Sequence, residues 1–232
     1  LLAIGIFNAF AAMTDTVEFR GTATFPVTRA LIDALTSSFS IIPIIIAIYY
    51  AGELVWRDRD RRVHEIVDAT AAPDWAFVVP KVLAITLVLT ASYVMAVATS
   101  MLFQLFHGYT HLEPMAYLLP SARLRVATTL PLLLAMLAVF VQALVPHKFM
   151  GWAVMLVYLV ASITLNTIGF EHNLYNYGGA SEVPLSDMNG MGRFWVGRAW
   201  FQAYWLAFGL MLLVATHLLW RRGAETRLMP RF

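Results

Sequence analysis

The chain has 232 residues, of which 60% are hydrophobic and only 13% are charged, and its mean hydropathy is +0.70. Soluble domains typically contain about 45–50% apolar and about 25% charged residues, so this composition excludes an ordinary soluble protein and indicates an integral membrane protein. The pI near 9.0 does not indicate nucleic-acid binding, because the basic residues lie beside apolar segments, where they set topology and meet the lipid bilayer.

Apolar segments of membrane-spanning length follow one another along the chain. A spanning helix needs roughly 20 apolar residues to cross about 30 Å of hydrocarbon. Five segments meet this requirement, namely residues 30–52, 82–106, 126–145, 149–168 and 199–220. Residues 1–13 are too short and have no signal-peptide pattern, so we expect them to be the end of a truncated span in a fragment of a longer chain. The sequence therefore predicts an all-α, polytopic membrane helix bundle of about six transmembrane helices, forming one domain over residues 1–232.

Basic residues favour one orientation of this bundle. The elbow at residues 53–75, the turn at 147–148 and the C-terminal tail fall on one side of the membrane if the five full spans alternate. With Lys81 at the entrance of the next span, that side holds ten of the sixteen Lys and Arg residues, against six on the other. The positive-inside rule then predicts that the elbow is cytoplasmic and that residues 169–198 form an outer loop.

The elbow has the most informative pattern in the chain. Trp56, Val63, Ile66 and Val67 fall at helical spacing with charged residues between them, which predicts one amphipathic helix of about four turns that Pro73 ends. The helix is interpreted either as a solvated, topogenic segment or as a docking helix for a cytoplasmic partner. The candidate elbow residues are Trp56, Arg57, Arg59, Arg61, Arg62, Val63, Glu65, Ile66, Val67 and Asp68.

The outer loop combines six of the thirteen glycines with many aromatic residues. A disordered linker would lack that apolar content, so we expect a folded cap over the outer end of a pathway. The alternative is an aromatic belt at the level of the lipid headgroups. Its candidate functional residues are Glu171, His172, Asn173, Tyr175, Asp187 and Asn189.

Motifs for catalysis or for a resident cofactor are lacking. The string His64-Glu65-Ile66-Val67-Asp68 has Asp where the zinc motif H-E-x-x-H needs its second His, and no phosphate-loop motif for ATP occurs. A few histidines and acidic residues on the outer side (His107, His111, Glu113, Glu171 and His172) offer ligand atoms, but interfacial hydrogen bonding explains them better. We therefore expect no enzyme activity, no metal and no cofactor. No charged residue lies at the middle of a predicted span, which disfavours an ion-driven transporter.

The elbow and its flanks resemble the permeases of type-2 ATP-binding-cassette (ABC) exporters. The resemblance lies in a span followed by Arg57–Arg62, the run His64–Val67, the pair Ala72-Pro73, and Pro80-Lys81 at the entry of the next span. The chain departs from the family pattern by having Pro80 where glycine is common and Ala72 before the proline. In that family this segment is the coupling elbow, and the number of spans and the long loop before the last one also fit.

A narrower resemblance runs from about Thr28 to the end of the chain. The phrases GELVWRDRDRRVHEIVDATAAPDW, KFMGWAVML, GFEHNLYNYGG and PLSDMNGMGRFW look like the permease part of bacterial proteins that join such a bundle to an aminopeptidase N-like metallopeptidase. The peptidase of such a protein would lie outside this sequence.

These resemblances imply the transmembrane half of an ATP-driven transporter, an exporter of the bacterial inner membrane. Its expected partners are a separate cytoplasmic ABC ATPase, a second permease half (a second copy or a fused bundle) and the lipid bilayer, but not nucleic acid. Two alternatives stay open. One is a membrane anchor or scaffold for a fused metallopeptidase that transports nothing, and the other is an intramembrane enzyme using the outer His and Glu residues.

Overall fold

The computed structural model describes residues 41–110, 112, 122–170, 172–180 and 193–220, together with short pieces of the first 40 residues. The side chains of residues 122–128 and 194–195 are outside that description. Within the described part the fold is a membrane helix bundle of six helices, α3 (Ile42–Asp60), α4 (His64–Asp68), α5 (Trp75–Phe106), α7 (Ala122–Leu144), α8 (Lys148–Ile168) and α9 (Phe194–Leu219). A two-residue antiparallel hairpin, β1 (Glu18–Phe19) and β2 (Thr22–Ala23), is the other element, so the predicted all-α class is confirmed.

The predicted spans agree with the helices to different degrees. Among the described residues, three helices are long and apolar enough to cross a membrane, and they are Trp75–Phe106, Lys148–Ile168 and Val196–Leu219. The span expected at 126–145 corresponds to α7, whose apolar stretch Thr129–Leu144 is shorter. The span expected at 30–52 corresponds in part to α3, which has Pro43 in its first turn and continues through charged residues to Asp60. Proline suits the first turn, because a helix leaves those N–H groups unbonded.

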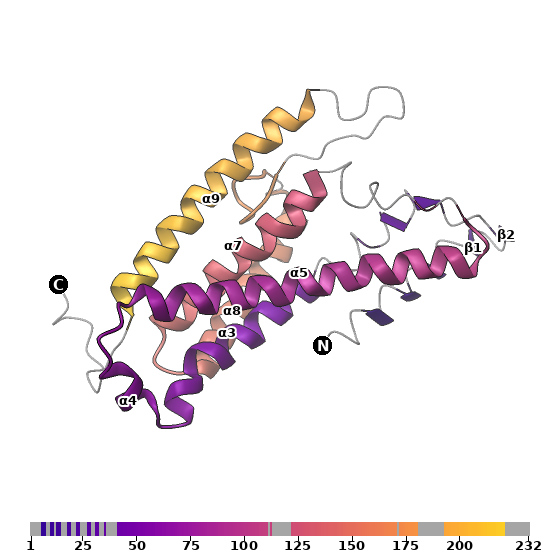
Figure 1. Ribbon diagram of the computed structural model, residues 1–232. Coiled ribbons are helices and arrows are strands. Elements are labelled where there is room, and N and C mark those ends of the chain that lie inside the picture. Colours follow the sequence, from indigo (N-terminus) through magenta and orange to yellow (C-terminus); the bar gives the residue numbers. More distant parts are fainter. Residues whose placement is uncertain are drawn as a thin grey trace.

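Helix α7 is the centre of the bundle. It packs against α9, α5, α3 and α8 (Figure 1). Its buried side chains include Leu134, Ala135, Ala138 and Val139, which join Ile46 and others of α3 and α5 in the main apolar core. Within a membrane, helices associate through van der Waals packing and not through the hydrophobic effect, so the small residues along α7 matter because they let neighbouring helices approach closely.

Helix α5 connects this core to a second one. At about 1.5 Å per residue its 32 residues are about 48 Å long, which exceeds the hydrocarbon thickness. The first half of α5 belongs to the main core, whereas Ala96, Val97 and Phe103 pack against Met13, Leu31, Ile32 and Leu35 of the N-terminal region. The side-chain amide of Gln104 donates a buried hydrogen bond of 3.2 Å to the hydroxyl of Thr28.

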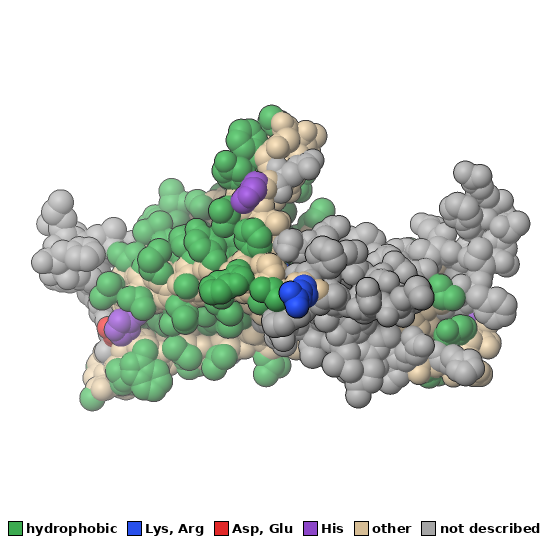
Figure 2. Space-filling view, turned by 90° about the horizontal axis from the view of Figure 1, so that it is seen from above, with side chains coloured by type: hydrophobic (Ala, Val, Ile, Leu, Met, Phe, Trp, Pro, Cys, Tyr) green, Lys and Arg blue, Asp and Glu red, His purple; other side chains and the backbone are tan. Residues whose placement is uncertain are grey.

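The described surface is largely apolar. Seen from above, hydrophobic side chains cover most of the described face, and few charged ones interrupt them (Figure 2). Helix α8 is the extreme case, because Gly151 and Met155 are its only buried residues. Exposed apolar helices are stable when lipid surrounds them, so this surface agrees with the composition.

Candidate functional site at the elbow end of the bundle

Five helix ends meet at one end of the molecule, which we call the elbow end. The C-terminal ends of α3, α7 and α9 line one cavity there, and the first residues of α5 and α8 supply lysines that contact α3. In Figure 1 this end carries α4 at the lower left, near the described end of α9. The elbow, the 147–148 turn and the last helix therefore lie together, as the alternation of the spans predicts.

The elbow is not the single amphipathic helix that its spacing predicts. Helix α3 continues to Asp60 and is followed by a break, and the separate α4 has only five residues. At the break Arg62 has a positive φ of 56°, and its N–H donates to Arg59 O at 3.0 Å. The next N–H, of Val63, donates to Asp58 O at 3.0 Å. This pair of hydrogen bonds is a Schellman motif, which ends a helix and turns the chain.

The break separates the apolar elbow residues onto different surfaces. Trp56 is 9% exposed and faces the bundle, whereas Ile66 is 75% exposed and α4 has no buried residue. The expectation that Trp56, Val63, Ile66 and Val67 share one helical face is therefore wrong, because the left-handed residue redirects the chain between them. Helix α4 also ends at Asp68, five residues before Pro73, and Pro80 lies within the first turns of α5.

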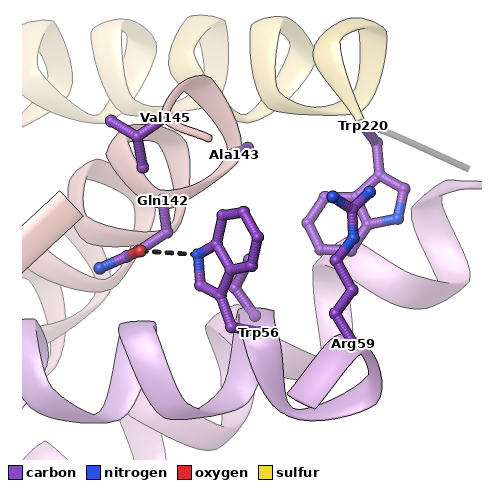
Figure 3. A pocket seen from close by; sticks show the side chains of 7 residues that line it. Trp56, Arg59, Gln142, Ala143, Val145 and Trp220 are labelled. Carbon is purple, nitrogen blue, oxygen red and sulfur yellow. Dashed lines mark hydrogen bonds between the residues drawn. The ribbon is translucent and has the colours of Figure 1, made fainter. Parts of the chain in front are cut away.

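A hydrogen bond anchors the last turns of α3 to α7. The indole Nε1 of Trp56 donates to Oε1 of Gln142 at 2.9 Å, and both side chains are buried (Figure 3). Within an apolar core such a bond is specific, because a buried polar group without a partner costs about 1–3 kcal/mol. Gln142 therefore ties the elbow residue Trp56 to the centre of the bundle.

Two glycines allow α8 to pack into the same region. A methyl group at Gly52 of α3 would overlap the indole of Trp152, and one at Gly151 would overlap the side-chain amide of Gln142. Both glycines are thus required by close helix–helix contact, a common device in membrane bundles. We call the set Gly52, Trp56, Gln142, Gly151 and Trp152 the seam, and it joins α3, α7 and α8.

Two lysines add charged contacts around the end of α3. Lys81 of α5 donates to Leu54 O at 2.7 Å and to Asp58 Oδ2 at 3.1 Å. Lys148 of α8 donates to Asp60 Oδ2 at 2.7 Å and to Glu53 Oε1 at 3.3 Å. The last turns of α3 are therefore held by three other helices, α5, α7 and α8.

A small cavity lies beside the seam. Figure 3 shows Trp56 and Gln142 on one side of it, and Arg59 and Trp220 next to each other on the other side. Its volume is about 30 Å³, which is enough for ordered water but not for a transported substrate. The guanidinium of Arg59 lies 5.3 Å from the centre of the Trp56 ring, a cation–π distance.

The described part of the outer loop packs against the middle of α7 and α9. The hydroxyl of Tyr177 donates to Leu133 O at 3.1 Å, and its ring contacts Trp205 and Phe208 of α9. Burial raises the pKa of the Tyr177 hydroxyl, so this donor keeps its proton. Residues 172–180 thus have a packed structure there.

The candidate residues of the outer loop differ in their contacts and in their exposure. His172 accepts a hydrogen bond from Leu174 N, and Tyr175 is 62% exposed and contacts Phe170 and His172 through its ring edges. Asn173 is partly buried, and its carbonyl oxygen lies where a side chain at Gly179 would have to fit. Glu171, Asp187 and Asn189 lie outside the described residues.

Metal-ligand geometry is absent from the described part of the chain. No group of three His, Cys, Asp or Glu side chains gathers there. His111 and Glu113 of the outer His and Glu cluster lie outside the described residues.

Comparison with protein-family models, with curated proteins and with solved structures finds no match. The geometry of the elbow end and the resemblance of its sequence to type-2 ABC permeases are therefore the observations that bear on function.

Sequence reasoning missed the partners of the elbow. Gln142 is the one polar residue between Phe140 and Pro146. A single amide side chain in an otherwise apolar helix end indicates a specific hydrogen bond to another helix. Gly52 and Gly151 give no such signal, because their role appears only when α8 is placed against α3 and α7.

Proposed function

We propose that this chain is the membrane-embedded permease half of an ATP-driven transporter, an exporter of the bacterial inner membrane. A separate cytoplasmic ATPase would supply energy, and a second permease half would complete the pathway. The proposal is supported by the resemblance at the elbow and by one structural observation. The exposed helix α4 stands outside the bundle, while the segment directly before it is held by three other helices.

This arrangement suits the transmission of force. An ATPase that contacts α4 would push on a five-residue helix with nothing buried. The push would reach α3 through the hydrogen-bonded turn at Arg61–Val63. The seam and the two lysines would then carry it to α7, α8 and α5, so the helix ends at the elbow would move together. Packed interfaces of this kind shift between discrete arrangements and do not deform continuously.

The test co-expresses the full-length chain with any phosphate-loop ATPase that a neighbouring gene encodes. Ile66→Asp adds a charge to the exposed tip of α4, and we expect it to abolish co-purification of the ATPase and its stimulated hydrolysis. The matched control is Ala71→Asp, which adds the same charge at an exposed elbow position outside α4. If Ile66→Asp retains both properties, α4 is not the contact with the ATPase and the elbow is only topogenic. If no ATPase associates with the chain, a non-transporting anchor for a fused metallopeptidase replaces this proposal.

A further inference from the structure

The turn at Arg62 differs from two similar turns in the same molecule. Helices α5 and α8 also end in Schellman motifs, with paired hydrogen bonds from Gly108 and Tyr109 and from Gly169 and Phe170. In both, the residue with positive φ is glycine, at 76° and 103°. At the end of α3 it is Arg62, the one non-glycine residue with positive φ in the described part of the chain.

An arginine is an unfavourable choice for this backbone conformation. The left-handed region costs a residue with a Cβ about 1–2 kcal/mol, whereas glycine adopts it freely. Arg57 and Arg61 are also four residues apart, so two like charges lie on the same face of α3, which costs a few tenths of a kcal/mol. The partial negative charge at a helix C-terminus favours cations, but it does not compensate the strained φ of Arg62. An external anion bound by these three arginine side chains reduces their mutual repulsion, and its binding energy offsets the backbone cost at Arg62.

The acidic residues near the turn are already paired. Asp58 forms an ion pair with Lys81, and Asp60 and Glu53 both form ion pairs with Lys148. The remaining elbow carboxylates lie beyond the turn, Glu65 and Asp68 in α4 and Asp74 directly before α5. Arg57, Arg61 and Arg62 are exposed, and no carboxylate in the described part of the chain forms an ion pair with them.

The level of these arginines relative to the membrane points to the chemistry of the anion. Trp75, which is 59% exposed, and Trp220 lie at the elbow end, and tryptophan concentrates at the membrane–water interface. Trp220 lines the same cavity as the buried Trp56, so Trp56 lies close to this level. Arg61 follows Trp56 by five residues, which is about 8 Å along the helix. The headgroup layer on each side of a bilayer is roughly 5–8 Å thick. The three guanidinium groups are therefore within reach of lipid phosphates.

We propose that Arg57, Arg61 and Arg62 form a binding site for the phosphate of an anionic lipid headgroup at the elbow. Guanidinium groups suit this ligand because their paired N–H donors match two phosphate oxygens. Lys81 and Lys148 do not contribute, since their charges are taken up by α3. This proposal needs only the membrane bundle and its elbow, and it stands whether or not the chain transports anything.

The experiment measures lipid binding to the full-length protein in detergent by native mass spectrometry. Phosphatidylglycerol is the anionic probe, and phosphatidylcholine is the zwitterionic reference. We expect the triple variant R57Q/R61Q/R62Q to lose affinity for phosphatidylglycerol on the order of 100-fold, about fivefold for each arginine, with no change for phosphatidylcholine. The matched control compares Arg61→Gln with Arg193→Gln, an exposed arginine at the other end of the bundle that should have no effect.

A second variant separates the strain from the charge. Arg62→Gly relieves the backbone while removing the guanidinium, so its thermal midpoint in phosphatidylcholine should rise while the stabilisation by phosphatidylglycerol shrinks. Unchanged phosphatidylglycerol affinity in the triple variant would overturn the proposal. So would an equal loss in Arg193→Gln, or an equal stabilisation by inorganic phosphate alone. Normal lipid binding combined with loss of the ATPase would instead make the arginines a protein-docking surface.

Discussion

The two halves of the elbow have opposite environments although their sequences are similar. The last turns of α3 and the short α4 are both rich in charged residues with a few apolar ones between them. The first is fixed by a buried hydrogen bond and by ion pairs from two other helices, whereas the second has no buried residue. A charged stretch between two spans can therefore contain one part that is fixed to the bundle, here the end of α3, and one part that is free to contact a partner, here α4.

The largest effect should come from filling the glycine contact of the seam. Gly52→Ala places a methyl group against the Trp152 indole, and α8 must move or the indole must leave its position. Overpacking of this kind costs about 1–3 kcal/mol, and Gly52→Leu should cost more. Thermal unfolding in detergent measures the loss. Ala153→Val, at an exposed position of α8, is the control and should hardly change the thermal midpoint. If Gly52→Leu is as stable as the wild type, the close contact between Gly52 and Trp152 does not contribute to stability.

The Trp56–Gln142 hydrogen bond should give the next largest effect. Gln142→Leu leaves the Trp56 indole without its acceptor in a buried place, at a cost of about 1–3 kcal/mol. Trp56→Phe removes the donor, and the double variant should be less destabilised than the sum of the two single ones. A double-mutant cycle by thermal or denaturant unfolding measures this coupling. Simple additivity would mean that the two side chains act independently.

The two lysines should have smaller and unequal effects. Lys148→Met breaks ion pairs whose acidic partners are 41% and 48% exposed, and such pairs contribute about 0–1 kcal/mol. Lys81→Met should cost somewhat more, because Lys81 is less exposed and also donates to the backbone of Leu54. Added salt should reduce the Lys148 effect more than the Lys81 effect. The reverse ranking would contradict the assigned contacts.

Apolar length predicted the helices better than pattern predicted the elbow. Residues 149–168 and 82–106 fall within α8 and α5, because a long apolar stretch in lipid has no alternative to a helix. The predicted span ends at residue 52, where hydropathy falls, but the same helix continues without a break through Asp60. Arginine is a good helix former, so the change from lipid to water did not end the helix.

The break at Arg62 could not be predicted from local sequence. A Schellman turn usually has glycine at its positive-φ position, as at Gly108 and Gly169. The turn after α3 has Arg62 there, so the sequence gives no sign of it. Without the break, Trp56 and Ile66 fall on one predicted face, although one is buried and the other exposed. The partners of Trp56 were equally hidden, because Gln142 lies 86 residues further along the chain.

The central claim is that α4 makes the contact with the ATPase and that the end of α3 transmits it. The most direct measurement compares co-purification and stimulated ATP hydrolysis for Ile66→Asp and for the double variant W56F/Q142L, each in the full-length chain reconstituted with the ATPase. The account predicts that Ile66→Asp loses both properties, while the double variant still binds the ATPase but no longer stimulates hydrolysis. Full stimulation by the double variant, or normal binding by Ile66→Asp, would contradict it.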